Sequence, residues 1–140
     1  GVEPLSRSFN KEYLYGLSKD SNLNIKKLIM DQKKVVGVGN IYASESLFLA
    51  KVKPTKISRN INLDECAAIV SSIKKILKYA IKMGGTTLND FYSADGSEGY
   101  FKLKLKVYGR EDKPCKSCSE VIKKINIGQR ATYYCAKCQS

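Results

Sequence analysis

The sequence lacks any long hydrophobic run. No apolar stretch approaches the roughly 18 residues that suggest a transmembrane span, and residues 1–10 contain none of the apolar character of a signal peptide. A basic helix with a bulky aromatic apolar face, which would favour a membrane surface, is also missing. We therefore expect no membrane partner.

Acidic residues are scarce relative to basic ones. The 140 residues include 13 Asp and Glu against 25 Lys and Arg, which leaves a formal net charge of +12. Such an excess attracts polyanions, and nucleic acid is the commonest of them because each neutralised phosphate releases condensed counterions. A hydrophobic content of 43% is sufficient for a core, so the chain should fold as one domain or as two small modules.

The first part of the chain has the apolar spacing of helices. Two short helices are expected within 4–33, the first with Ser8 or Asn10 as N-cap and the second at about 23–30. A glycine-punctuated turn at 35–40 then precedes a helix over 41–49, which Lys53-Pro54 should end.

The longest predicted helix begins at Asn62, where Glu65 completes a capping-box pattern, and runs to Met83 before Gly84-Gly85. Cys66 falls on its apolar face and is interpreted as a buried core thiol. That face comprises Leu63, Cys66, Ala67, Val70, Ile73, Leu77, Ala80 and Ile81. The lysines on the other side are interpreted as solvent-exposed rather than as a binding site: Lys74, Lys75, Lys78 and Lys82.

A polar, glycine-rich segment at 92–100 has no periodicity and predicts a loop or linker. Apolar residues then alternate with lysines over 101–108, which predicts a half-exposed strand. Residues 121–127 and 131–134 are expected to form a hairpin.

Four of the five cysteines form two Cys-x-x-Cys pairs, Cys115 with Cys118 and Cys135 with Cys138, separated by sixteen residues. This spacing is typical of a four-cysteine zinc site, because each tight turn presents two thiolates to a tetrahedral metal. Two disulfides or free thiols are the alternative. We predict one structural zinc ion, whose four sulfur ligands leave no position for activating water.

The tip of the predicted hairpin is rich in basic and polar residues. Arg130 follows Gly128-Gln129 there, and its guanidinium can fork onto a phosphate or remain a simple exposed arginine. The residues alone leave both interpretations open. Further lysines lie near the tip or near the second cysteine pair: Lys123, Lys124 and Lys137.

Two segments carry a specific resemblance. Val-Val-Gly-Val-Gly-Asn-Ile-Tyr-Ala-Ser-Glu-Ser-Leu-Phe at 35–48 and Gly-Gln-Arg-Ala-Thr-Tyr-Tyr-Cys-Ala-Lys-Cys-Gln at 128–139 closely resemble the formamidopyrimidine-DNA glycosylase family. Glu-Pro-Leu at 3–5, Met-Asp-Gln-Lys at 30–33, Gly-Gly-Thr-Thr-Leu at 84–88 and Val-Tyr-Gly-Arg at 107–110 agree in order. The resemblance implies a mainly α fold, with a helix-two-turn-helix domain at 1–90, a lesion-recognition-like loop at 91–100 and a β-hairpin zinc finger at 101–140.

The resemblance also implies DNA-binding residues. Asn40 and the backbone around Gly39 would hold phosphates beside the damaged nucleotide, which suits glycine amides next to a helix N-terminus. Arg130 would be the zinc-finger arginine at the lesion's phosphates, with a possible assisting role in catalysis. Lys26 would contact the DNA or the lesion, and the loop at 92–100 would close over the flipped base.

The implied activity is that of a base-excision repair enzyme that removes oxidised purines (8-oxoguanine, formamidopyrimidines) and cleaves the abasic strand. Its partner would be duplex DNA with damaged bases, bound by a monomer in the cytoplasm at the nucleoid. The family's catalytic domain begins Pro-Glu, with a free proline amine, whereas this chain begins Gly-Val-Glu-Pro and the nitrogen of Pro4 lies in an amide. We therefore expect the catalytic domain to be absent from these residues and the chain alone to be inactive.

Two alternatives remain at this level. The endonuclease VIII branch shares the architecture but favours oxidised pyrimidines; the Gln-Arg-Ala-Thr at 129–132 and the Gly-Tyr-Phe at 99–101 favour the first family. A non-catalytic zinc-ribbon nucleic-acid adaptor is the rival from another class.

Overall fold

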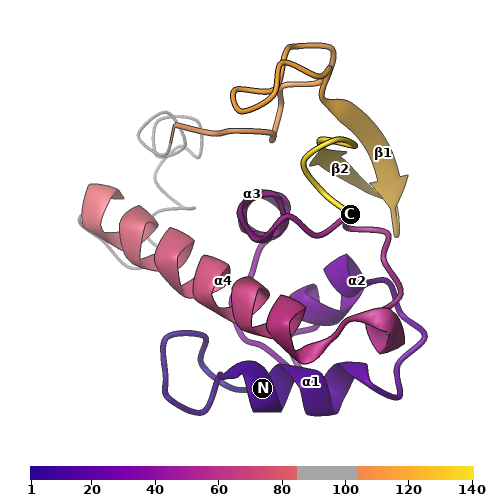
Figure 1. Ribbon diagram of the computed structural model, residues 1–140. Helices are drawn as coiled ribbons and strands as arrows, with labels where there is room; N and C mark the ends of the chain where they lie inside the picture. Colours follow the sequence, from indigo (N-terminus) through magenta and orange to yellow (C-terminus); the bar gives the residue numbers. More distant parts are fainter. Residues whose placement is uncertain (85–103) are drawn as a thin grey trace.

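The computed structural model describes residues 1–84 and 104–140, a helical part followed by a β-hairpin (Figure 1). The loop expected at 91–100, Gly85 and the start of the strand expected at 101–108 lie outside the described residues. The elements are α1 (Lys11–Ser18), α2 (Ile25–Met30), α3 (Asn40–Ala50), the 3-10 helix η1 (Ser58–Asn60), α4 (Leu63–Gly84), β1 (Lys123–Ile127) and β2 (Arg130–Tyr134).

The helix starts follow from side-chain caps. Asn10, rather than Ser8, caps α1 by accepting a hydrogen bond from the Tyr13 N–H at 2.8 Å. At α4 the capping box is reciprocal, because the Glu65 N–H donates to Asn62 at 2.8 Å and the Asn62 N–H donates to Glu65 at 3.1 Å. The predicted cap of the longest helix is confirmed.

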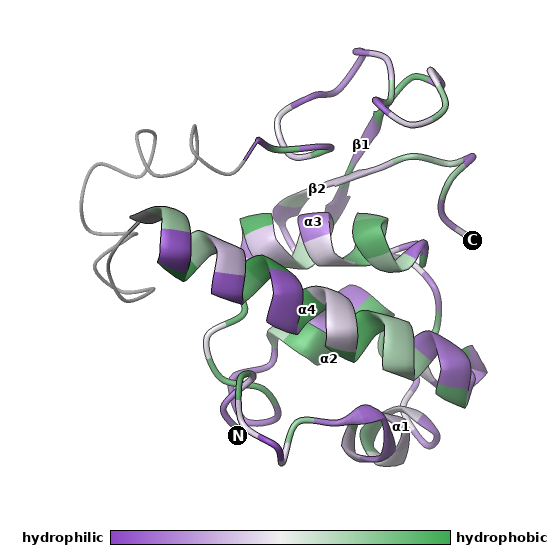
Figure 2. Cartoon of the chain, turned by 60° about the vertical axis from the view of Figure 1, so that its left-hand side comes forward, coloured by the Kyte–Doolittle hydropathy of each residue, from purple (hydrophilic) through white to green (hydrophobic). Residues whose placement is uncertain are grey.

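α3 lies at the centre of the molecule. It packs against α4 on one side, contacts α2, and is covered by β2 of the hairpin, while α1 packs on α4 (Figures 1 and 2). Every residue of α3 from Asn40 to Phe48 is buried. The main apolar cluster draws on α1, α2, α3 and α4 and includes the fully buried Cys66, which confirms its interpretation as a core thiol.

Two expectations for α4 need correction. Leu63 is 40% exposed, so the buried face begins one turn later, at Cys66. Lys74 is not simply solvated, because its Nζ donates to the Ser6 carbonyl at 2.8 Å and lies 5.9 Å from the centroid of the Phe9 ring. The remaining lysines of that face are exposed as expected: Lys75, Lys78 and Lys82.

The expected strand at 101–108 is wrong over its described part. Residues 104–108 form no strand. Instead, the N–H groups of Lys106, Val107 and Tyr108 donate to the buried Glu45 carboxylate at 2.8, 2.9 and 2.8 Å. Three successive donors aimed at one carboxylate turn the backbone around it, and the side chain of Val107 is fully buried. Glu45 on α3 therefore takes the bonds that a neighbouring strand would have made.

β1 and β2 form the predicted antiparallel hairpin, in the register Lys123↔Tyr134 to Ile127↔Arg130. The two turn residues both have positive φ, 56° at Gly128 and 65° at Gln129, as a two-residue type I′ turn requires. Within residues 1–84 and 104–140, no helix combines the length and apolarity needed to cross a membrane.

Candidate metal site and nucleic-acid interface

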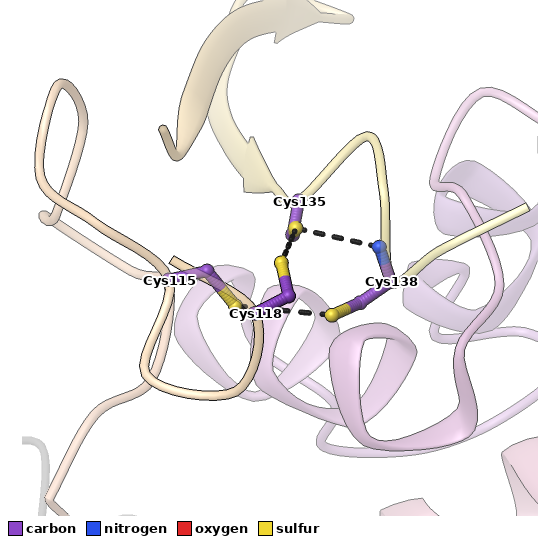
Figure 3. A group of neighbouring side chains, drawn as sticks. All are labelled: Cys115, Cys118, Cys135 and Cys138. Carbon is purple, nitrogen blue, oxygen red and sulfur yellow. Dashed lines mark hydrogen bonds between the residues drawn. The ribbon is translucent and has the colours of Figure 1, made fainter. Parts of the chain in front are cut away.

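The four paired cysteines converge on one point (Figure 3). Their sulfur atoms all lie within 4.8 Å of one another, with Cys118 and Cys135 at 3.5 Å and Cys115 and Cys138 at 3.9 Å. A tetrahedral zinc ion with Zn–S bonds of about 2.3 Å separates its sulfurs by about 3.8 Å. The donor set and its spacing therefore fit zinc.

Local bonds preorganise the two cysteine pairs. The Ser117 N–H donates to the Cys115 sulfur and the Cys138 N–H to the Cys135 sulfur, each at 3.4 Å. Burial and the neighbouring thiols raise the pKa of Cys138 to about 12. A divalent cation would reverse this effect by favouring the thiolates. None of these cysteines is in a disulfide, and sulfurs 3.5 Å apart are far from the roughly 2.05 Å of an S–S bond.

The cysteine knuckles are attached to α3. Phe48 of α3 packs with Val107, Ile122 and Tyr133 in a second apolar cluster around the cysteines. Gln139 adds a polar link, because its side chain accepts from the Cys135 N–H at 2.8 Å and donates to the Val52 carbonyl at 2.9 Å. The metal site thereby fixes the hairpin against the helical part.

Lys26 occupies the junction between α2, α3 and the hairpin. Its side chain is 1% exposed, and its Nζ donates to Oδ1 of Asn40 and to Oγ1 of Thr132, both at 2.5 Å. The Asn40 amide in turn donates to the Ala131 carbonyl at 2.9 Å. Lys26, Asn40 and Thr132, which we call the junction cluster, therefore hold the first residue of α3 beside the hairpin.

The junction cluster carries an uncompensated positive charge. Burial, and then the nearby Arg130 guanidinium, lower the pKa of Lys26 to about 8. No carboxylate in the described part of the chain lies within 4.0 Å of Lys26 or Arg130. An anion arriving at this surface would relieve the repulsion between these cations.

Of the residues singled out from sequence, the structure brings together Lys26, Asn40 and Arg130. Gly39 directly precedes α3 in extended backbone (φ −84°, ψ 176°), with no side chain to cap the first N–H groups of the helix. Arg130 is exposed at the start of β2, next to the Ala131 carbonyl that Asn40 contacts. Lys26 is buried beneath them.

Sequence reasoning missed three residues that shape this region. Thr132 lies within the segment 128–139, but nothing in the sequence indicated that its hydroxyl accepts a hydrogen bond from Lys26. Glu45 looks like an ordinary helical acid, and nothing local marks it as an acceptor for residues about sixty positions later. Lys27 lines a cavity with Arg130, although it looked like one lysine among many.

Two known protein families match this chain. The formamidopyrimidine-DNA glycosylase H2TH domain matches residues 1–92, and the zinc finger found in FPG and IleRS matches residues 112–140. The chain belongs to the formamidopyrimidine-DNA glycosylase family. The resemblance seen in the two motifs is confirmed, and the four cysteines form the structural zinc site of this family's zinc finger.

Relatives agree over the whole chain. Formamidopyrimidine-DNA glycosylases of Haemophilus influenzae (strain PittEE) and Xylella fastidiosa (strain 9a5c) are 49% and 50% identical over 139 residues, which cover 99% of this chain and 51% of each relative. The MutM (Fpg) structure from Thermus thermophilus superposes with a TM-score of 0.86 at 35% identity, over 99% of this chain and 53% of that one. Lactococcus lactis Fpg in complex with abasic-site DNA gives 0.85 at 35% identity, over 100% and 51%. The chain thus spans about half the length of these relatives and corresponds to their H2TH and zinc-finger part.

Proposed function

We propose that this chain is the DNA-binding portion of a glycosylase and AP lyase that removes oxidised purines, and that its ligand is duplex DNA containing a damaged base. One observation carries the proposal. The junction cluster fixes the N-terminus of α3 and the Arg130-bearing end of the hairpin beside each other, over an unpaired positive charge. Elements from opposite ends of the chain thereby form one anion-binding surface.

The chemistry of this surface suits a DNA backbone. The side-chain amide of Asn40 donates one hydrogen to the Ala131 carbonyl and has a second hydrogen that can be donated to a phosphate oxygen, while its Oδ1 accepts a hydrogen bond from Lys26. Gly39 allows a phosphate to approach the uncapped first N–H groups of α3. Arg130 supplies a planar guanidinium for bidentate contact. In this arrangement Lys26 acts from behind Asn40, by orienting it and by adding charge.

Relatives support the same ligand. The Lactococcus lactis protein is recorded with DNA containing an abasic site and with DNA containing FAPY-dG. At 35% and 34% identity over the full chain, those complexes make damaged duplex DNA the natural ligand to propose here. We propose in addition that the protein acts as a monomer and that it is located in the cytoplasm, at the nucleoid.

We further propose that the chain alone does not perform the covalent chemistry. A Schiff base at the sugar needs a free amine, and the nitrogen of Pro4 is in an amide. Lys26 has the lowered pKa that a nucleophilic lysine needs, yet its Nζ is buried and bound to Asn40 and Thr132.

The proposal is tested by measuring the affinity of the purified chain for a duplex containing an abasic-site analogue and for the matched undamaged duplex, across a range of salt concentrations. Binding whose logarithm falls linearly with log salt supports the proposed surface. Binding that is absent at low salt, or that does not respond to salt, would refute it.

A further inference from the structure

A cavity of about 170 Å³ lies between α2 and the tip of the hairpin. Lys27 of α2 and Arg130 of β2 are the exposed cations of its lining, and Lys26 is buried beneath them. The complete lining is Lys26, Lys27, Met30, Asp31, Ile127, Gly128 and Arg130. Two elements far apart in sequence thus place three cations around one hollow.

The Lys27 side chain lies across the hairpin turn. A Cβ atom placed on Gly128 would come within 2.7 Å of Cε and 3.4 Å of Nζ of Lys27. The lysine stem therefore runs over the glycine, and its ammonium group ends beside the turn that presents Arg130. Glycine therefore suits position 128 for two reasons: it leaves room for the Lys27 side chain, and its φ of 56° favours glycine.

The charge of Lys27 is not neutralised within the described residues. Asp31 is the acidic residue of the lining, but its Oδ2 lies 3.6 Å from Nζ of Lys34 and its Oδ1 accepts the Lys33 N–H at 3.0 Å. In residues 1–84 and 104–140, no carboxylate lies within 4.0 Å of Lys27. The mouth of the cavity is therefore positive and unpaired.

We propose that Lys27 binds a phosphate of the DNA backbone, next to the phosphate assigned to Arg130. This inference rests on the proposed function of the chain. An ammonium whose stem already packs on Gly128 loses less conformational freedom on binding than a free surface lysine does. A phosphodiester suits a point charge of this kind, because neighbouring backbone phosphates allow Lys27 and Arg130 to bind at the same time.

The test compares Lys27→Met with the unchanged chain and with Lys78→Met, which removes an exposed lysine of α4. Methionine keeps an unbranched stem over Gly128 while removing the charge. Affinity for a duplex with an abasic-site analogue is measured by fluorescence anisotropy between 0.1 and 1 M salt. Zinc content and thermal unfolding of each variant establish that the fold is retained, and Lys27→Glu serves as a second variant at the same exposed position.

We expect Lys27→Met to lower the slope of log K against log salt by about 0.9, which corresponds to about eightfold weaker binding at 0.1 M salt and convergence near 1 M. Lys27→Glu should weaken binding further, and Lys78→Met should leave the slope unchanged. If Lys27→Met matches Lys78→Met while Arg130→Gln still lowers the slope, the role of Lys27 is refuted and the proposed function stands. If the unchanged chain shows no salt-dependent binding, the proposed function itself fails.

Discussion

The Nζ atom of Lys26 lies 2.5 Å from Oδ1 of Asn40, and this hydrogen bond joins α2 to the first residue of α3. The same Nζ reaches Thr132 on β2, so a single buried ammonium connects the helical part with the zinc finger. Its position explains why two motifs about ninety residues apart form one surface. It also makes the surface sensitive to the protonation of one group.

DNA affinity should depend on pH through Lys26. Its pKa is lowered to about 8 by burial and by Arg130, so it loses its proton between pH 7 and pH 9, and a phosphate is held less strongly by the neutral form. We expect affinity to fall over this range with a midpoint near pH 8. Lys26→Met should bind more weakly at pH 7 and lack that midpoint. Anisotropy titrations at pH 7, 8 and 9 measure this, and equal pH profiles for the two proteins would contradict it.

The same lowered pKa sets the sign of the effect on stability. An unfolded lysine has a pKa near 10.4, so between pH 8 and about 10.4 the unfolded chain binds more protons than the folded one. The contribution of Lys26 to the free energy of unfolding therefore rises with pH across this window and is constant below it. Denaturant titrations of the unchanged chain and of Lys26→Met, compared as differences between pH 8 and pH 10, check the direction. If the free energy of unfolding rose more between pH 8 and pH 10 for Lys26→Met than for the unchanged chain, the assigned direction would be wrong.

One zinc ion per chain should be bound, and removing it should affect the two parts unequally. The apolar cluster of the helical part is separate from the cluster around the cysteines, so a chelator should abolish the hairpin while leaving the helical circular dichroism signal largely intact. DNA affinity should be lost at the same time, because Thr132 and Arg130 are no longer held. Elemental analysis and circular dichroism test this, with Cys66→Ala as the control that should retain zinc. Zinc-free material with an ordered hairpin would contradict it.

Glu45→Ala should be among the more destabilising substitutions in the chain. It removes the acceptor of three backbone N–H groups, and the Val107 N–H would be left buried without a partner. Hydrogen bonds to a charged group contribute about 1.5–3 kcal/mol each, and their losses are not additive. We expect the free energy of unfolding to drop by roughly 3 kcal/mol. Glu12→Ala, at an exposed carboxylate of α1, is the control, and a similar small change in both would show that the anchor is unimportant.

The chain alone should not release 8-oxoguanine and should give little covalent complex with abasic DNA under borohydride. The nitrogen of Pro4 lies in an amide, and Nζ of Lys26 is buried and bound to Asn40 and Thr132. Because free amines react slowly with abasic sites, the trapped yield is compared with that of a complete formamidopyrimidine-DNA glycosylase under the same conditions. A comparable rate would place a competent nucleophile within these 140 residues.

The features predicted correctly from the sequence are those that depend on residues close together in the chain. The Asn62-Glu65 cap, the buried Cys66 and the four cysteine ligands all depend on residues a few positions apart, and each is where the sequence indicated. The hairpin expected at 121–127 and 131–134 is also observed, with Gly128 in its turn. The DNA contacts came from the family resemblance and remain predictions.

Long-range contacts were beyond these rules. Alternation at 104–108 predicted a strand, but Glu45 of α3 captures that backbone across some sixty residues. The hydrogen bond between Lys26 and Thr132, which lies 106 residues later, has no local sequence signal, and the expected contact of Lys26 with DNA stays a prediction. Lys74 was assigned to solvent because its partner, the Ser6 carbonyl, belongs to a segment without a regular pattern. In each case a polar group found its partner through tertiary packing.

Salt dependence of DNA binding by the Asn40→Ala, Arg130→Gln and doubly substituted chains, with Lys78→Met as the charge control, tests the proposed surface most directly. Arg130→Gln removes a charge at a phosphate and should lower the slope of log K against log salt by about 0.9, whereas Asn40→Ala removes a neutral hydrogen bond and should weaken binding with little change in slope. The double variant should therefore show a slope lower by about 0.9 and bind more weakly than either single variant, while retaining zinc. A double variant with the slope of the unchanged chain would show that the surface joined by Lys26 does not bind DNA.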